Sequence, residues 1–415
     1  MIMSEIIDTS RKAVTKGSAC CRVVFLLLII SASPSGAVGI RLPNQDPEGI
    51  ARGNAFAATA DNPSAIYYNP AGITQLQGQQ LRAGLYLISA NTEFSSPGGD
   101  AETDAEFQPV PQLYYTLSLQ EKLPLTFGLG IYAPYGLSVD WGENNPFRTA
   151  AQSGKLLYAS INPVVAWRVN SCLSLAIGPT FNYSEADLKQ GLTPFNPQDH
   201  FKFEGNAFGV GFNAGLLWQP HPQWSFGVNY RSATELDYDG TSRTTPTSPF
   251  PYYPETSTET SLDFPQFIAA GISYRPNEKW NFEIDVDWTD WDVVNTIFFR
   301  GTPLGDIPFV FNYESSFMYE FGATRQLANG YFISFGYIYS ENSIPDRDFN
   351  PIVPDSDLHL GSIGFGHHGQ RWDWALGYHF AYNGGREISN NTNPSVDGTY
   401  KTFNNAVNIS ATFKF

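Results

Sequence analysis

The stretch FEIDVDW, residues 282–288, alternates apolar and acidic side chains with a period of two. Phe282 and every second residue after it are apolar, whereas Glu283 and every second residue after it are carboxylates. Successive side chains of a β-strand point to opposite faces, so this pattern predicts a strand with one apolar and one polar face. Residues 208–218 and 407–415 show the same period of two, with glycine or uncharged polar residues and one lysine opposite the apolar face. The sequence therefore predicts a protein built from half-buried strands.

About fourteen such segments follow residue 78. They begin near residues 79, 107, 124, 155, 172, 201, 223, 258, 279, 311, 330, 355, 371 and 400. Short turns alternate with long connections, and the short turns lie at 120–123, 169–171, 220–222, 275–279, 327–330 and 368–371. The long connections lie near 95–106, 139–154, 188–200, 239–257, 292–310, 342–354 and 387–399. An antiparallel outer-membrane barrel predicts this arrangement, because its turns are tight on one side, its loops are long on the other and its strand number is even.

The composition agrees with a barrel and excludes other classes. The chain has 415 residues with 31 Phe, 22 Tyr and 9 Trp, but only 3 Met. Beyond the N-terminal region, no apolar run approaches the ~20 residues that a membrane helix needs. Cys172 is the only cysteine after residue 21, so neither an internal disulfide nor a multi-cysteine metal site is expected.

The first 37 residues have the parts of a secretory signal peptide. Four basic residues precede the apolar run VVFLLLII (23–30), and small residues follow it, so we predict cleavage after Ala37. Removal takes four basic and two acidic residues, so 24 Lys and Arg against 40 Asp and Glu become 20 against 38, a net charge of −18. A chain this acidic is unsuited to nucleic acid.

Aromatic residues mark the ends of the predicted strands. Five tryptophans beside short turns are expected to form an aromatic girdle at the periplasmic interface, namely Trp167, Trp218, Trp224, Trp280 and Trp372. The chain ends on Phe415, with Phe413 and Ile409 on the same face. An aromatic residue at the end of an amphipathic strand predicts recognition by the barrel assembly machinery.

Residues 38–78 precede the first strand and do not alternate. They include NPSAIYYNPAGIT (62–74), which is rich in proline yet apolar, so its backbone is expected to be irregular. Residues 49–60 are predicted to form one helix. A barrel of about fourteen strands is wider than its own side chains fill, and irregular backbone at membrane depth must be buried in protein or line a cavity. We therefore expect residues 38–78 to plug a barrel formed by residues 79–415.

The stretch GIARGNAFAATADNPSAIYYNPAGIT (49–74) resembles the N-terminal hatch of the FadL-type long-chain fatty-acid and hydrocarbon transporters of Gram-negative outer membranes. Asn69, Pro70 and Ala71 match the Asn-Pro-Ala motif of that family. The resemblance continues over residues 133–141, 161–170, 230–240 and 263–291. It implies a fourteen-stranded barrel with an N-terminal hatch and passive uptake of hydrophobic molecules. It also implies capture at extracellular loops and lateral release into the bilayer through a kink in the third strand.

The third predicted strand contains residues suited to such a kink. Pro134, next to Tyr135, cannot donate a ladder hydrogen bond, and Gly130 and Gly136 favour bulges. A lateral exit suits an apolar cargo, since burying each CH₂ is worth about 0.8 kcal/mol. Apolar residues of the long connections are candidates for first capture of substrate: Phe195, Phe250, Tyr252 and Tyr253.

The sequence leaves the substrate open between fatty acids and neutral hydrocarbons. A fatty acid carries a carboxylate, and Arg168, Arg231 and Lys414 alternate with outward apolar residues, so they are candidates to face the lumen. The acidic net charge favours neither kind of substrate. We expect the barrel to lie in outer-membrane lipid as a monomer without a cofactor.

Three other functions compete with hydrophobic transport. An enzyme needs a nucleophile with its base or a metal motif, but the sequence contains no G-x-S-x-G or H-E-x-x-H, so no catalytic or metal residue is assigned. A general porin for small hydrophilic solutes fits the alternation equally well, but it needs an open lumen. A purely structural barrel needs neither the plug nor the kink.

Overall fold

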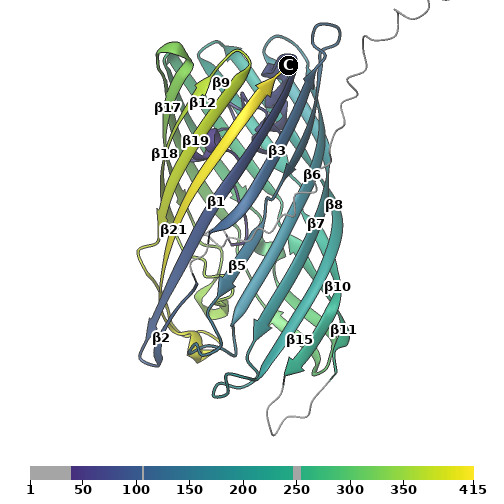
Figure 1. Cartoon of the computed structure of the whole chain (residues 1–415), viewed down its shortest axis with the longest axis vertical. Helices are drawn as coiled ribbons and strands as arrows, with labels where there is room; N and C mark the ends of the chain where they lie inside the picture. Colours follow the sequence, from purple (N-terminus) through teal and green to yellow (C-terminus); the bar gives the residue numbers. More distant parts are fainter. Residues whose placement is uncertain (1–38, 105–106, 246–253) are drawn as a thin grey trace, which may run out of the picture.

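The chain forms one closed antiparallel β-barrel (Figure 1). The computed structural model describes residues 39–104, 107–245 and 254–415, so the predicted signal peptide lies outside the described residues. The barrel closes where β1 (Gln79–Ser96) pairs with β21 (Gly398–Lys414), from Gln80↔Lys414 to Ser95↔Thr399. The other strands are β2 (Gly99–Glu102), β3 (Gln108–Ser118), β4 (Leu125–Tyr132), β5 (Gly136–Asp140), β6 (Ser153–Arg168), β7 (Leu173–Gln190), β8 (His200–His221), β9 (Trp224–Arg231), β10 (Thr234–Thr245), β11 (Thr256–Phe264), β12 (Phe267–Asn277), β13 (Trp280–Thr289), β14 (Thr296–Thr302), β15 (Gly305–Val310), β16 (Ser316–Gln326), β17 (Tyr331–Ser340), β18 (Leu358–His368), β19 (Trp372–Tyr382) and β20 (Arg386–Ile388).

These strands make fourteen crossings of the wall, because several crossings consist of two consecutive strands. The divided crossings are β2 with β3, β4 with β5, β9 with β10, β11 with β12, β13 with β14, β15 with β16, and β19 with β20. The predicted fourteen-stranded antiparallel barrel is confirmed. Short turns gather at the end where β21 terminates and long connections at the opposite end (Figure 1), so the predicted alternation is confirmed as well.

The predicted connection at residues 292–310 is mostly strand in the structure. Residues 292–310 are expected to be a long loop, but they contain the hairpin of β14 and β15, with Pro303 and Leu304 between the strands. Phe299 and Phe309 of this hairpin are buried. The run of apolar residues at 297–299 hides the period of two, because Phe298 on the opposite face is also apolar.

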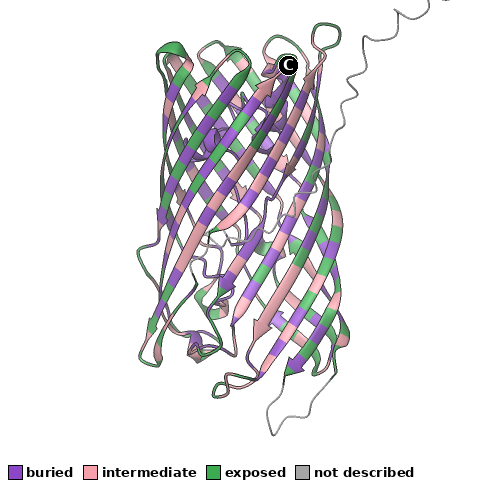
Figure 2. Cartoon of the chain, viewed as in Figure 1, coloured by how far each residue is buried: buried purple, intermediate pink, exposed green. Residues whose placement is uncertain are grey.

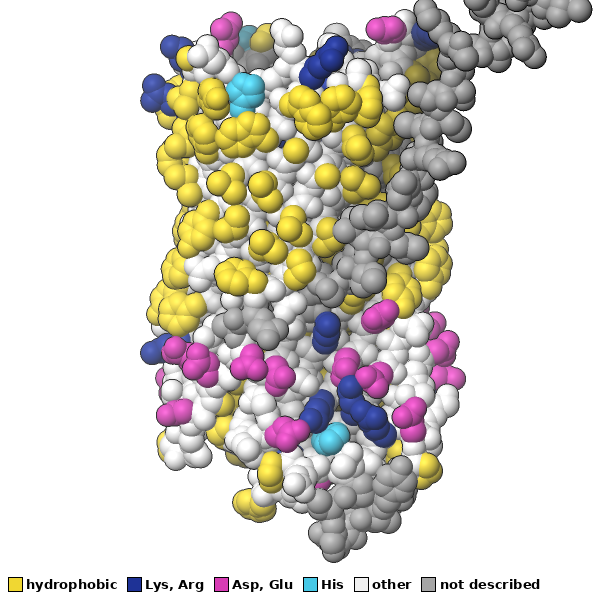
Figure 3. Space-filling view, viewed as in Figure 1, with side chains coloured by type: hydrophobic (Ala, Val, Ile, Leu, Met, Phe, Trp, Pro, Cys, Tyr) yellow, Lys and Arg dark blue, Asp and Glu magenta, His cyan; other side chains and the backbone are white. Residues whose placement is uncertain are grey.

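Apolar side chains face outward and form a band around the short-turn half of the barrel (Figure 3). In β13, Ile284 is 54% exposed whereas its neighbour Asp285 is 1% exposed, so the carboxylates of FEIDVDW point into the barrel. Figure 2 shows the same alternation of exposed and buried residues along the other strands. A lipid-facing barrel needs this inside-out distribution.

The five tryptophans of the predicted girdle lie beside the short turns on the outer face. Trp167, Trp218, Trp224 and Trp372 are exposed, and Trp280 is half-buried. Beyond the apolar band, towards the long-loop end, charged side chains cover the wall (Figure 3). No helix among the described residues is long and apolar enough to cross a membrane.

Residues 39–78, called here the internal segment, lie inside the barrel and are almost all buried (Figure 1). They contact strands on several sides of the wall, including β4, β8, β18 and β19. Their helices are α1 (Pro47–Ile50), α2 (Ala65–Tyr68) and the 3₁₀ helix η1 (Pro70–Gln75). Other 3₁₀ turns are η2 (Trp291–Val293), η3 (Ala328–Gly330), η4 (Asp346–Asp348) and η5 (Pro394–Val396).

The single helix predicted over residues 49–60 is wrong. The helix α1 ends at Ile50, and Gly53 and Asn54 both adopt a φ of 59°, in the left-handed region that a right-handed helix cannot contain. The backbone N–H groups of residues 56–59 then bond to carboxylates of β13. Local sequence cannot show this, because the bonding residues are at least 224 positions apart.

Candidate functional site: a break in the wall and the segment behind it

The third crossing of the wall is interrupted between β4 and β5. The strand β4 pairs with β3 on one side and β6 on the other, whereas β5 pairs with β6 alone among the described strands. Pro134 lies in the interruption, where a residue without a backbone N–H is expected. The wall therefore contains a seam between β3 and β5, both of which lie on the near face in Figure 1.

Two prolines of β3 mark the other side of this seam. The strand β3 pairs with β1 over its length from Gln108, but it pairs with β4 only from Leu113 to Ser118. Pro109 and Pro111 lie in the part without a β4 partner. The N–H of Ser118 donates to Gly78 O, on the β1 side, so the odd-numbered residues of β3, Pro109 and Pro111 among them, point their backbone groups to the seam. Proline offers no donor there to another strand. The stretch QPVPQ (108–112) is a sequence signal for this edge that the alternation alone does not reveal.

The internal segment covers the break from inside the barrel. The backbone N–H of Leu42 donates to Pro134 O at 2.8 Å, and the N–H of Gly136 donates to Ile40 O at 2.9 Å. Arg41, between them, forms an isolated antiparallel bridge with Tyr135. Residues 40–42 thus satisfy backbone groups that the interrupted strand leaves without a ladder partner.

Arg41 holds this covering stretch against the opposite wall. Its guanidinium donates to both carboxylate oxygens of Asp287, at 2.7 and 2.6 Å, and to Thr289 Oγ1 at 2.7 Å. Both partners of the ion pair are buried. A bidentate pair of this kind fixes orientation as well as distance, so the position of residues 40–42 depends on β13.

Tyr135 and Gly130 have different surroundings within the third crossing. Tyr135 is buried, donates its hydroxyl to Pro265 O at 2.9 Å and packs against Phe264. Gly130 stays in regular register, so the predicted bulge at that residue is wrong. A Cβ at Gly130 would lie 2.9 Å from the side chain of Ile66. The glycine therefore makes room for the internal segment.

Carboxylates of β13 bind a second part of the internal segment. Asp285 and Glu283 accept hydrogen bonds from the backbone N–H groups of residues 56–59, at 2.7–3.1 Å. Glu283 also pairs with Arg52 at 3.0 Å. The inward face of FEIDVDW therefore supplies the anchors, and the alternation that predicts the strand also predicts that these groups share a face.

The residues of the Asn-Pro-Ala motif join the internal segment to itself and to β8. Asn69 Oδ1 accepts from the N–H of Ala71 at 3.2 Å and caps η1. Its Nδ2 donates to Ala57 O at 2.7 Å and to Leu216 O at 2.9 Å. Pro70 begins η1, where a missing N–H costs nothing. The motif thus fixes a turn of the segment against the wall.

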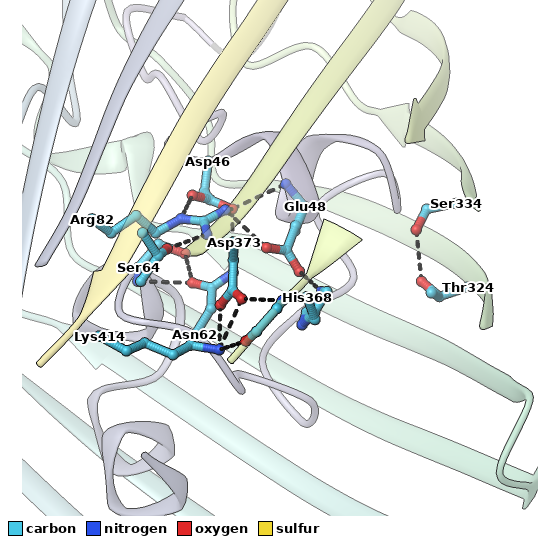
Figure 4. Close-up of polar contacts among 12 residues, drawn as sticks. Asp46, Glu48, Asn62, Ser64, Arg82, Thr324, Ser334, His368, Asp373 and Lys414 are labelled. Carbon is cyan, nitrogen blue, oxygen red and sulfur yellow. Dashed lines mark hydrogen bonds and ion pairs between the residues drawn. The ribbon is translucent and has the colours of Figure 1, made fainter. Parts of the chain in front are cut away.

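Further ion pairs hold α1 near the short-turn end (Figure 4). Arg82 of β1 binds Asp46 at 2.5 and 2.9 Å and Glu48 at 2.9 Å. Glu48 also lies 3.3 Å from His368 Nε2, at the end of β18. Asp46 caps α1 by accepting from the N–H of Glu48. Charge-assisted contacts therefore attach the segment to the wall at two places: at Arg41 beside the break and at α1 near the short-turn end.

Arg231 lies deepest among the three basic residues expected to face the lumen. Arg168 binds a carbonyl of the internal segment, and Lys414 binds a carboxylate of β19. Arg231 is 4% exposed and donates to Tyr132 Oη at 2.6 Å, with the ring of Tyr67 beside it. No carboxylate among the described residues forms an ion pair with Arg231. Its guanidinium is thus a buried cation next to the last residue of β4.

The interior of the long-loop half is packed with aromatic side chains. Phe94, Trp141, Phe147, Phe349 and Tyr400 are buried with ring centroids 4.7–6.3 Å apart. One continuous apolar cluster contains these residues together with Ile40 and Tyr135 at the break. Apolar contacts therefore extend from the long loops to the break in the third crossing.

The structure tests the positions of only some predicted capture residues. Phe195 is 94% exposed in the connection between β7 and β8. The other three residues, Phe250, Tyr252 and Tyr253, lie outside the described residues. A hollow of about 250 Å³ between the long connections is lined in part by Phe309 and Phe349, which the sequence pattern does not single out.

A closed barrel with an apolar outer band and inward polar side chains defines an outer-membrane β-barrel. Residues 27–415 match the family described as outer membrane protein transport protein (OMPP1/FadL/TodX), and the chain belongs to that family. Its members are outer-membrane transport channels and not enzymes. The predicted family and the predicted location in the Gram-negative outer membrane are confirmed.

Individual relatives are distant but cover most of the chain. The long-chain fatty acid transport protein of Salmonella typhi is 22% identical over 372 residues, covering 81% of this chain and 85% of that protein. The solved FadL homologue of Pseudomonas aeruginosa has a TM-score of 0.80 at 16% identity, covering 91% of this chain and 100% of that one. The Pseudomonas putida toluene transporter TodX has a TM-score of 0.71 at 16% identity, covering 93% and 100%. At these identities the solved structures support the shared fold.

Proposed function

We propose that this protein takes up hydrophobic molecules passively and releases them sideways into the membrane through the seam between β3 and β5. The observation that carries the proposal is the missing strand pairing, with residues 40–42 bonded behind the break. Unpaired backbone at membrane depth is tolerated only when buried in protein or lining a cavity. Displacement of the cover would open the wall where an apolar molecule meets lipid without entering water.

The internal segment acts as the hatch in this proposal. Its covering stretch is hydrogen-bonded to the break through Ile40 and Leu42. The turn formed by Asn69, Pro70 and Ala71 holds the segment against β8. The aromatic cluster of the long-loop half reaches Ile40 and Tyr135. A substrate captured among the loops, with Phe195, Phe250, Tyr252 and Tyr253 as candidate contacts, would follow this apolar path and displace residues 40–42.

We propose a long-chain carboxylic acid as the preferred substrate. Curated relatives are named long-chain fatty acid transport proteins and solved neighbours include toluene transporters, so both classes occur among related proteins. Arg231 favours the acid, because a buried cation is costly without a partner and a carboxylate would supply one. It contacts Tyr132 directly before the break, at the point where the path ends.

The test measures uptake of labelled oleate, and separately of labelled toluene, by cells that express the barrel. One variant replaces Pro134 and Gly136 by Val, and a second replaces Pro109 and Pro111 by Val, so that the ladder across the seam can form. We expect at least a tenfold loss of uptake in both. Pro222→Ala, in the exposed turn between β8 and β9, is the control and should leave uptake unchanged.

Two outcomes would reject the proposal. Full uptake by correctly inserted seam variants would exclude lateral release. Entry of small sugars without faster entry of either labelled compound than in empty cells would favour the general porin instead.

The remaining partners are part of the same proposal. Phe415 is 68% exposed and packs edge-on against Phe413, so its ring is accessible to the assembly machinery at the end of β21. The outward apolar band is suited to outer-membrane lipid. We propose that the barrel works there as a monomer.

A further inference from the structure

The short-turn end of the barrel carries a charge opposite to that of the whole chain. Its six short turns contain four Lys or Arg residues and two Glu residues, namely Lys122, Arg275, Lys279 and Arg371 against Glu121 and Glu278. These turns therefore have a formal charge of +2, whereas the whole chain has −16. Lys and Arg side chains lie along this edge of the apolar band in Figure 3.

Lys279 and Arg325 bring two positive charges together on the outer face. Arg325, near the end of β16, lies directly opposite Trp280 of β13 in the antiparallel ladder. Lys279 precedes Trp280 in the turn between β12 and β13. Both cations are exposed, and neither forms an ion pair with a carboxylate of the described residues, Glu278 of the same turn included. Both charges are therefore available to an anion from outside the protein.

Trp280 places these two cations at the edge of the apolar band. Its indole stacks on Phe282 with ring centroids 5.4 Å apart, and the guanidinium carbon of Arg325 lies 5.3 Å from the centre of the indole. Tryptophan in membrane proteins is enriched at the level of the lipid headgroups, with its apolar body towards the hydrocarbon. The two cations beside Trp280 are therefore at the depth of the lipid phosphates.

Apolar side chains continue from Arg325 towards the middle of the membrane. Ala323 is the next residue of β16 on the outward face, and it pairs with Phe282 of β13 on one side and with Phe335 of β17 on the other. Phe282 is 42% exposed and Phe335 is 47% exposed. A small side chain between two exposed rings gives an acyl chain a surface to pack on, directly beside the cations.

We propose that Lys279, Trp280 and Arg325 bind one anionic phospholipid, of the phosphatidylglycerol type, in the periplasmic leaflet. Short turns of an outer-membrane barrel lie on the periplasmic side, and basic residues at a membrane surface attract anionic lipids. The guanidinium of Arg325 matches the geometry of a phosphate, and Lys279 adds a second charge. A zwitterionic lipid is bound less well, because its own ammonium group is repelled by the two cations. The bound lipid holds the short-turn ends of β13 and β16 at the headgroup level.

The test measures lipid binding to the purified full-length barrel by native mass spectrometry, with dioleoylphosphatidylglycerol and dioleoylphosphatidylcholine titrated separately. The acyl chains are the same, so a difference reports on the headgroup. We expect the first phosphatidylglycerol to bind about fivefold or more tightly than the first phosphatidylcholine, as cations at a membrane surface predict. The double variant Lys279→Gln with Arg325→Gln should remove most of this preference. Arg300→Gln with Lys401→Gln, at two exposed cations of the long-loop half, is the matched control and should retain it.

Three outcomes would overturn the proposal. Equal affinity of the wild type for the two lipids would show that the cations do not select the headgroup. A preference that persists fully in the folded Lys279 and Arg325 double variant would show that the anionic lipid binds elsewhere. Displacement of phosphatidylglycerol by inorganic phosphate at the same concentration would show a site for free anions instead of a lipid. No transport substrate is used, so the result is independent of the transport proposal.

Discussion

Arg231 is the residue whose surroundings bear most directly on substrate choice. Its guanidinium has a phenol as its hydrogen-bond partner and aromatic rings around it. A charge-assisted hydrogen bond is worth about 1.5–3 kcal/mol, which corresponds to roughly tenfold or more in binding. We therefore expect Arg231→Gln to lower oleate uptake about tenfold and to leave toluene uptake unchanged.

Parallel uptake assays with the two labelled compounds check this expectation. Arg243→Gln, at an exposed position of β10, is the control for loss of one positive charge. Equal loss of both compounds in the Arg231 variant would assign the residue a structural role and leave the substrate class open.

Asn69 shows how far single residues could be foreseen. The sequence placed Asn69, Pro70 and Ala71 in the expected plug through a family motif, and the cap of η1 is a local contact typical of Asn. Its bond to Leu216 O is not local, since the two residues are 147 positions apart. Only the closed barrel brings β8 to that turn.

At the scale of elements, glycines of the wall let the backbone of the internal segment pack closely against the strands. A Cβ at Gly336 of β17 would lie 1.9 Å from Gly53 N, which is far inside van der Waals contact. Overpacking of this kind typically costs about 1–3 kcal/mol. We expect Gly336→Ala to speed hydrogen exchange of residues 50–55 without unfolding the barrel, as judged by its heat-dependent mobility in detergent gels.

A second glycine of the neighbouring strand provides the matched control. A Cβ at Gly361 of β18 would meet no atom within 4 Å, so Gly361→Ala should leave exchange of residues 50–55 unchanged. Unchanged exchange in both variants would show that the internal segment does not depend on close packing against Gly336 of β17.

The connection between β7 and β8 carries a pH-dependent contact. Burial alone would raise the pKa of Asp199, but hydrogen bonds from Thr193 and Arg148 favour the ionised form more and lower that pKa below its usual value. A depressed pKa contributes stability that is present above the ordinary value of about 3.9 and is lost as pH falls through the folded value. This connection should therefore loosen only in acid.

Hydrogen exchange of residues 191–199, corrected for the intrinsic effect of pH, measures this loosening. We expect protection to be constant from pH 7 to about pH 4 and to fall below that. Asp199→Asn should weaken protection at neutral pH and remove most of the acid-dependent change. Wild-type protection that stays constant down to pH 2 would contradict the assignment.

At the scale of the whole molecule, the internal segment determines whether the barrel is closed. Deletion of residues 39–78 removes the partners of the inward carboxylates of β13. We expect the shortened barrel to conduct ions in planar bilayers and to prefer cations, because the row of inward carboxylates on β13 attracts them. The full chain should not conduct steadily under the same conditions.

The control for this experiment is the folded state of the shortened barrel, read from heat-dependent gel mobility. A folded but non-conducting barrel would show that the wall closes without the segment. Conduction without cation preference would show that the carboxylates of β13 do not face the open lumen.

The extent to which sequence predicted structure follows from the range of the interactions. Alternation in FEIDVDW assigned each side chain to a face because the period of a strand is a local property. The prediction of a single helix over 49–60 was wrong because Gly53 and Asn54 adopt left-handed φ angles. The N–H groups that follow them donate to carboxylates of β13 instead of to helical carbonyls. The edge at Pro109 and Pro111 was readable in principle, since proline marks an unpaired edge.

The sequence by itself determined the wall of this protein, namely its fourteen crossings, the faces of its strands and the end that carries the short turns. These features depend on periodicity and turn residues, which act over a few positions. Only the tertiary structure decided that residues 40–42 cover the break and that Asp285 and Glu283 accept hydrogen bonds from residues 56–59. Those contacts join parts of the chain more than 90 positions apart, and closure of the barrel alone sets which groups meet inside it.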